Sequence, residues 1–153
     1  MRLEKMNIDQ YKLYVAREIP LYAEETAKSQ EIEMEVALEN SKKSFQSLLP
    51  LGLETENHFL FNVVNDEEKI VGDLWLNLRG EKKLRIYIYN IVIHEKFRGL
   101  GFGKKTMKLV ENFAREKNCE SVDLHVFGHN KTARGLYESM GFGPLSIVMR
   151  KSL

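Results

Sequence analysis

The chain has few cysteines, no long apolar run and little net charge, and each of these absences excludes a class of protein. It has a single cysteine, Cys119, among 153 residues, so no disulfide can form within the chain and we expect a reducing, cytoplasmic environment. No segment reaches the roughly 18 consecutive apolar residues that a membrane-spanning helix needs, and Met1 to Asp9 lacks the apolar stretch of a signal peptide. The formal net charge is only +1, which argues against nucleic acid or a membrane surface as a partner.

Composition indicates one globular domain, and the charges are divided between an acidic region and a basic region of the sequence. A hydrophobic content of 43% supports a full core over residues 1–153 as a single domain. Residues 9–40 carry three basic and eight acidic side chains (3 − 8 = −5), whereas residues 82–117 carry ten basic and three acidic ones (10 − 3 = +7). A basic centre suits a polyanionic ligand and an acidic amino-terminal part suits a cationic one, although solvated helix faces would give the same pattern.

The most informative segment is a glycine-rich run between a predicted strand and a predicted helix. Arg85–Ile93 is dominated by β-branched and aromatic residues, as in a buried strand. The glycine-rich run Arg98–Lys104 follows, and apolar residues at helical spacing then predict an amphipathic helix to about Asn118. Glycines and the unpaired N–H groups of a first helical turn together form a cradle for phosphate.

Two common phosphate motifs do not fit this run. The Walker A pattern would require a glycine where the chain has Arg98, and the dinucleotide fingerprint would require its third glycine at Lys104. The run instead fits Arg/Gln-x-x-Gly-x-Gly/Ala. A second segment, Asn130–Phe142, fits Asn-x-x-Ala-x-x-Leu-Tyr-x-x-x-Gly-Phe and follows a predicted strand at Val122–Val126. These two motifs in this order resemble the GNAT superfamily of N-acetyltransferases over about residues 84–143.

The resemblance implies an α/β (α+β) single-domain acyl-CoA N-acyltransferase fold, with a mixed, mostly antiparallel sheet and helices on both faces. The sequence agrees with the element order that this fold requires. Asp9 is expected to cap a helix reaching about Thr26. The remaining expected elements are a first strand at 2–6, a second helix at 31–48, strands at 58–64, 70–78 and 84–93, a helix at 132–139 and a last strand at 147–151. Only eleven residues follow Phe142, fewer than the family's usual terminal hairpin, so the sheet edge and the choice between monomer and homodimer stay open.

The resemblance also implies that acetyl-CoA is the co-substrate and assigns residues to it. The pyrophosphate would be held by Arg98, Gly99, Leu100, Gly101, Phe102, Gly103 and Lys104. The pantetheine would pair with the backbone of Ile91 and Ile93, in a slot where a bulged fourth strand splays from the fifth. The second motif adds Asn130, Ala133 and Tyr137.

Tyr137 matches the family tyrosine that protonates the departing thiolate, so the resemblance predicts acetyl transfer to an amine by direct attack in a ternary complex. The general base stays open. A glutamate of some relatives is replaced by Tyr87, which leaves five candidates: Tyr87, Tyr89, Asn90, Glu24 and Glu25. A non-catalytic acyl-CoA-binding regulatory module of the same fold is therefore the alternative. The acceptor would be a small-molecule or peptide amine.

The histidines do not predict a metal site. His125 and His129 are four residues apart but span a strand end and a loop rather than a helix. We expect His125 to lie near the cofactor slot or the acceptor as a hydrogen-bonding group.

Overall fold

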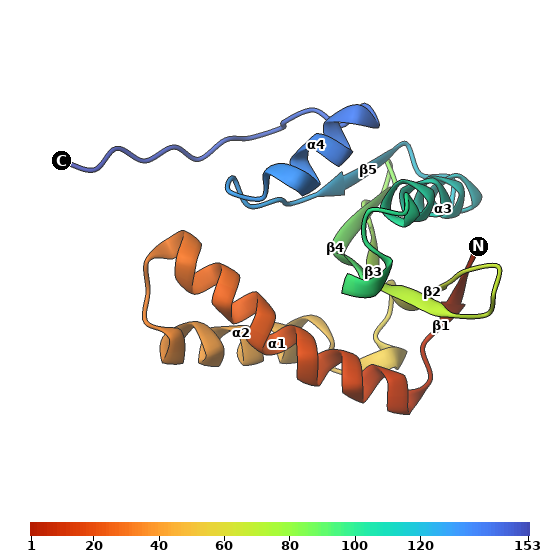
Figure 1. Cartoon of the computed structure of the whole chain (residues 1–153), viewed down its shortest axis with the longest axis horizontal. Coiled ribbons are helices and arrows are strands. Elements are labelled where there is room, and N and C mark those ends of the chain that lie inside the picture. Colours follow the sequence, from red (N-terminus) through yellow and green to blue (C-terminus); the bar gives the residue numbers. More distant parts are fainter.

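The computed structural model describes all 153 residues, and its elements are arranged around one five-stranded sheet (Figure 1). The strand order is β1-β2-β3-β4-β5, with antiparallel pairing from β1 to β4 and parallel pairing between β4 and β5. The strands are β1 (Arg2–Lys5), β2 (His58–Val64), β3 (Ile70–Arg79), β4 (Arg85–Ile93) and β5 (Ser121–Leu124). The expected mixed, mostly antiparallel sheet is confirmed.

Four helices flank the sheet: α1 (Ile8–Gln30), α2 (Met34–Leu48), α3 (Phe102–Glu116) and α4 (Lys131–Ser139). Single 3-10 turns are formed by η1 (Gly52–Glu54) and η2 (Glu95–Phe97). No helix combines the length and the apolar composition that crossing a membrane requires.

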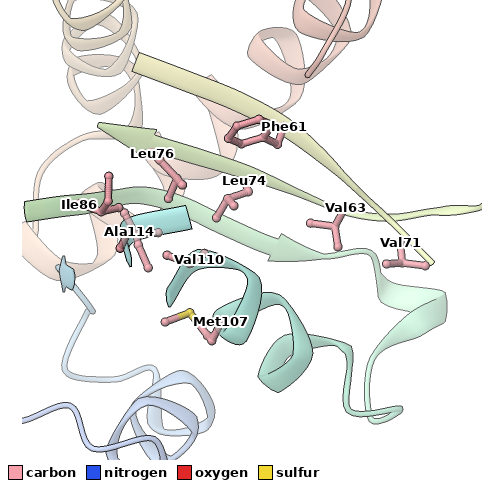
Figure 2. Close-up of a cluster of buried hydrophobic side chains, with 10 residues drawn as sticks. Phe61, Val63, Val71, Leu74, Leu76, Ile86, Met107, Val110 and Ala114 are labelled. Carbon is pink, nitrogen blue, oxygen red and sulfur yellow. The ribbon is translucent and has the colours of Figure 1, made fainter. Parts of the chain in front are cut away.

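Helix α3 covers one face of the sheet, and Figure 2 shows its apolar side pressed against β3 and β4. From α3, Met107, Val110 and Ala114 pack on Leu74 and Ile86 of these strands. The opposite face carries a second, more aromatic cluster that brings in α1 and α2. The members of this cluster are Met6, Tyr14, Phe45, Leu49, Leu60 and Trp75.

The expected start of the first helix is wrong by two residues. Asn7, not Asp9, caps α1: the Asn7 side chain accepts from the Gln10 backbone N–H at 2.9 Å, and the Gln10 side chain accepts from the Asn7 N–H at 2.9 Å. This reciprocal capping box satisfies two donors at once, which a cap at Asp9 would not. The helix then continues through Pro20 to Gln30, one turn beyond the predicted Thr26.

The expected last strand at 147–151 is also wrong, because residues 143–153 run as extended chain without a strand partner. A strand exists only beside another strand, and Figure 1 shows this segment leading away from β5 toward the terminus marked C. The side chain of Val148 is 97% exposed. The sheet therefore ends at β5.

Candidate functional site

The glycine run joins β4 to α3 through a turn that only glycines adopt readily. Gly99 and Gly101 have φ of 76° and 77°, in the left-handed region, where a side chain costs about 1–2 kcal/mol. A Cβ added at either position would meet no protein atom within 4 Å. The glycines are therefore required by the backbone conformation and not by crowding, and the space beside them is open to a ligand.

The backbone amides of this run have no acceptor within the protein. Every N–H from Gly99 to Lys104 lacks a backbone or side-chain partner, and the first bonded amide of the turn is that of Lys105, which donates to the Gly101 carbonyl at 3.2 Å. The first turn of α3 contains no acidic residue, and the positive end of its dipole points into the same space. This arrangement fits an anionic group such as a diphosphate.

Arg98 supports this turn from the side. Its Nε donates to the carbonyl of Ile93 at 3.0 Å, which ties the end of β4 to the start of the glycine run. The guanidinium is thus held beside the unpaired amides. It adds positive charge where the sequence predicts phosphate.

The strand before the run opens a slot in the sheet. β4 pairs with β5 only from Arg85 to Ile88, opposite Ser121 to Leu124. Next to that point, the register between β3 and β4 shifts so that Tyr89 is the extra residue between Ile88 and Asn90. The bulge expected from the family resemblance is present, and beyond it β4 has no neighbour on the side of β5.

Ile91 and Ile93 turn their backbone groups into this slot. The His94 N–H donates to Val71 of β3 at 2.9 Å, so in an antiparallel pair the alternate residues 91 and 93 point away from β3. The Ile93 carbonyl is indeed oriented outward, since it accepts from Arg98. An extended ligand arm in the slot would find the N–H groups of Ile91 and Ile93 without a strand partner.

Tyr137 on α4 borders a cavity of about 1010 Å³ that is also lined by β5 and His125. Its hydroxyl makes no hydrogen bond to the protein, and burial raises the pKa of this phenol above its ordinary value of 10.0. The group thus stays protonated at neutral pH and free to donate. α4 is held against α3 where Gly103 meets Leu136, since a Cβ on that glycine would stand 3.2 Å from the leucine Cδ2.

Asn130 serves as the cap of α4. Its side-chain oxygen accepts from the Ala133 N–H at 3.1 Å, so this pair fixes where the helix carrying Tyr137 begins. The Asn130 side-chain oxygen and the Ala133 N–H are thus bonded to each other, unlike the amides of the glycine run.

The face under α1 holds a chain of charged groups that the sequence analysis missed. Arg17 bonds two carboxylates, Glu18 at 2.7 Å and Asp73 at 2.7 Å. The same Asp73 oxygen, Oδ2, also contacts His94 Nε2 at 2.7 Å. Glu18 is 5% and Asp73 4% exposed, and buried carboxylates of this kind are retained only where they are paired.

This network reaches β4 next to the bulge. Asn90 donates to Glu18 at 2.7 Å and contacts the Tyr14 hydroxyl at 3.1 Å. Burial raises the pKa of Tyr14 well above its ordinary value, with the Glu18 charge adding to the effect. The only sequence signal for the network was an aspartate, Asp73, inside a largely apolar strand, because a charge there requires a buried partner.

The candidate bases on α1 differ in their surroundings. Glu24 is exposed, whereas Glu25 is paired with His129 of the loop after β5. The rings of Tyr22 and Phe127 lie 6.4 Å apart alongside that pair. The loop after β5 is therefore held against the carboxyl-terminal half of α1, which brings Glu25 to the site.

The two candidate tyrosines on β4, Tyr87 and Tyr89, both interact with Arg79. The Arg79 guanidinium lies 3.7 Å from the centre of the Tyr87 ring, and its Nη2 donates to the Tyr89 hydroxyl at 2.6 Å. Burial raises the pKa of Tyr87, although the charge of Arg79 acts in the opposite direction. A phenol held protonated in this way is a poor base, and Asn90 is engaged in the network of α1. No three histidine, cysteine or carboxylate side chains are grouped so that they could hold a metal ion.

Comparisons with known proteins agree with this geometry. Residues 16–142 match the model of the acetyltransferase (GNAT) family. The N-acetyltransferase YycN of Bacillus subtilis is 37% identical over 99% of this chain and 97% of its own, and YdgE of the same organism is 32% identical over the same shares. The crystal structure of YycN superposes with a TM-score of 0.94 at 36% identity, covering 99% of this chain and 97% of that one. The family model matches most of the chain, and the similarity to these relatives extends over nearly the full length of both proteins. This protein therefore belongs to the GNAT family of acetyltransferases.

Proposed function

We propose that this acetyltransferase moves an acetyl group from acetyl-CoA to an amine by direct attack within a ternary complex. The observation that carries the proposal is the row of backbone amides from Gly99 to Lys104 that have no acceptor in the protein. These amides lie directly after a strand whose outward N–H groups, at Ile91 and Ile93, also lack a strand partner. A diphosphate with an extended arm, as in coenzyme A, matches both features.

The reaction balances with the groups present. The thioester supplies an activated acyl carbon; the amine nitrogen forms a bond to that carbon, and the carbon–sulfur bond breaks. The Ile91 N–H, directed into the slot, would stabilise the oxyanion that develops meanwhile. The thiolate takes a proton from the Tyr137 hydroxyl, which burial keeps protonated. The amine, which attacks in its neutral form, gives up one proton to solvent as the amide forms, and the Tyr137 phenolate regains a proton from solvent.

The carboxyl-terminal half of α1 and the loop after β5 would bind the acceptor. Glu25 and His129 lie together there, and carboxylates favour a cationic amine. One protein of the same fold, AAC(6')-Iy, has been crystallised with a bisubstrate analogue of coenzyme A and acetylneamine, although it is only 13% identical, with a TM-score of 0.61. It supports a ternary arrangement for this fold without naming an acceptor for this chain.

A binding comparison tests the diphosphate grip. Calorimetric titration with acetyl-CoA should give saturable binding, whereas S-acetylpantetheine, which lacks the diphosphate, should bind at least about tenfold more weakly, because only acetyl-CoA reaches the amides. Equal affinities for the two would place binding elsewhere.

A second measurement tests transfer itself. Release of the coenzyme A thiol is followed with lysine, polyamine, aminoglycoside and peptide amines as acceptors. Turnover with any of them supports the enzyme. Tight acetyl-CoA binding without turnover on any amine would favour the non-catalytic module, for which the engagement of Tyr87 by Arg79 in place of a glutamate base is the supporting feature.

A further inference from the structure

Two of the eight arginines have no carboxylate partner in the protein. The other six are each paired with an aspartate or a glutamate: Arg2, Arg17, Arg85, Arg115, Arg134 and Arg150. The two exceptions are Arg98, at the proposed diphosphate site, and Arg79, the last residue of β3. Arg79 is half-buried, where a charge is costly unless it is compensated. The protein itself supplies no counter-charge for this guanidinium.

Neutral groups hold the Arg79 guanidinium in one orientation. Its Nε donates to the Asn77 side chain at 2.8 Å, and its Nη2 donates to the Tyr89 hydroxyl at 2.6 Å. The guanidinium carbon lies 3.7 Å from the centre of the Tyr87 ring and 5.0 Å from that of Tyr89. Nη1 makes no hydrogen bond within the protein. The end of the guanidinium formed by Nη1 and Nη2 can therefore bind a carboxylate through two parallel hydrogen bonds.

Arg79 lies next to the region where the acceptor would bind. Tyr87, which it contacts, borders the cavity of about 1010 Å³ together with His125 and Tyr137. Tyr87 also pairs with Asp123 of β5, one residue before the point at which β4 and β5 part. Arg79 makes no hydrogen bond or ion pair with the buried charged network under α1. Its charge is thus directed to the cavity side of the sheet and not to that network.

Glu25 supplies the opposite charge in the same region. It is paired with His129 in the loop after β5, where the Phe127 ring lies 6.4 Å from that of Tyr22 on α1. Burial raises the pKa of Tyr87, and Tyr22 adds to the effect, so this part of α1 is close to β4. A molecule with both an ammonium group and a carboxylate would complement both charges, whereas a simple amine would complement only one.

We propose that the acceptor carries a carboxylate as well as its amine, and that Arg79 binds this carboxylate. The inference rests on the proposed acetyl transfer and narrows the acceptor from any amine to an amino acid or a similar amino carboxylate. The carboxylate does not react, so Arg79 would bind it equally in the ground state and in the transition state. Loss of Arg79 should therefore raise the KM for the acceptor and leave kcat nearly unchanged.

Matched acceptors test this selectivity. Lysine differs from cadaverine, and 6-aminohexanoate from pentylamine, only by a carboxylate. In at least one pair, the wild type should have a kcat/KM at least about tenfold higher for the member with the carboxylate, as expected for one charge-assisted contact. Arg79→Gln should abolish this preference through KM, and Arg79→Lys should retain part of it.

Arg2→Gln is the matched control, because it removes an equal charge from β1, at the other edge of the sheet. It should leave the preference unchanged. A wild-type ratio near one in both pairs, or a preference that survives Arg79→Gln, would overturn the proposal. The wild-type ratio decides the matter even where Arg79→Gln fails to fold.

Product binding gives a second measurement that does not depend on turnover. In calorimetric titrations of the protein saturated with coenzyme A, 6-acetamidohexanoate should bind at least about tenfold more tightly than N-pentylacetamide. This difference should be absent in Arg79→Gln. Equal affinities, or no binding of either compound, would refute the carboxylate site and leave the proposed acetyl transfer standing. Equal affinities for acetyl-CoA and S-acetylpantetheine would instead count against the proposed function, since neither compound depends on Arg79.

Discussion

Helix α3 covers its face of the sheet with apolar side chains, whereas α1 covers the opposite face with aromatic rings and a chain of buried charged groups. On the α3 side the proposed ligand contacts are backbone groups whose directions follow from glycines close together in the sequence. On the α1 side, the buried charged side chains meet only because α1, β3 and β4 are folded together. The comparison separates a ligand cradle built from local backbone geometry from a charged network built by tertiary packing.

The two sides also differ in how they should respond to mutation. A backbone cradle tolerates changes of side chain but not of dihedral angle, because its donors are main-chain N–H groups. A buried network fails when any one charge is removed, because the remaining charges lose their partners. We therefore expect variants on the α3 side to lower ligand binding or turnover, and variants on the α1 side to lower stability.

The largest effect should come from Tyr137→Phe. Removing a general acid lowers kcat by about 100- to 10,000-fold, or about 3 to 5 kcal/mol in the barrier, while acetyl-CoA affinity should stay nearly unchanged. Because burial raises the Tyr137 pKa above 10.0, this group should cause no fall in wild-type activity between pH 7 and 9.

Steady-state kinetics at saturating acetyl-CoA, with a titration of the same protein, provide the measurement. Tyr11→Phe is a matched control, since Tyr11 packs against the cluster under α1, and its kcat should be that of the wild type. Equal kcat for Tyr137→Phe and the wild type would remove this phenol from the mechanism.

The second effect is on stability. Arg17→Met leaves Glu18 and Asp73 buried without their shared cation. Such a loss costs about 3–5 kcal/mol for a fully buried pair, and the 40% exposure of the Arg17 side chain reduces our expectation to about 2 kcal/mol. Urea unfolding followed by fluorescence measures it.

Arg150→Met supplies the contrast, because its ion pair with Glu31 is exposed and should be worth less than about 1 kcal/mol. If Arg17→Met lowered the free energy of unfolding by no more than Arg150→Met does, the charged network would contribute no more than an exposed ion pair. The two faces of the sheet would then not differ in how they depend on buried charge.

The same distinction explains what could be predicted from the sequence. Strand β2, the end of α2 at Leu48 and the start of the glycine run are fixed by local patterns, and the structure has them where the sequence placed them. The cap at Asn7 was missed because Asp9 is an equally good capping residue type. In α1, hydrophobic periodicity does not identify the buried face, since Glu18 is buried while Leu13 is 73% exposed.

The absent last strand has a different cause. Ile147–Lys151 has strand composition, but a strand needs a neighbour, and no local pattern reports where that neighbour lies. For the same reason the sequence placed Glu24 and Glu25 among five candidate bases and overlooked Glu18, whose significance comes from Asn90 and Asp73 on other elements. Contacts between segments distant in the sequence were therefore the structural features that the sequence could not predict.

The third effect tests the cradle on the α3 side. Gly101→Ala places a side chain at a φ of 77°, which costs about 1–2 kcal/mol and either strains the loop or turns its amides. We expect about a tenfold weaker affinity for acetyl-CoA, measured by calorimetry. Gly128→Ala is the control, because its added Cβ meets nothing within 4 Å and its φ is ordinary. Unchanged affinity for Gly101→Ala would mean that the left-handed turn does not position the amides.

The smallest effect is a pH dependence on the α1 side. His58 accepts a hydrogen bond from the Trp75 indole at 2.9 Å, and burial, with the nearby charge of Arg79, lowers the pKa of its imidazole. Below an unfolded pKa of about 6.5, the unfolded chain therefore binds the proton more readily than the folded one. The free energy of unfolding should fall as the pH drops from 7 through 6.5 until the folded pKa is passed.

His58→Gln keeps an acceptor for the indole but does not titrate. Between pH 7 and 5, the free energy of unfolding measured in urea should therefore change less steeply with pH in this variant than in the wild type. Equal slopes would place the imidazole in water and remove it from the aromatic packing that distinguishes this face of the sheet.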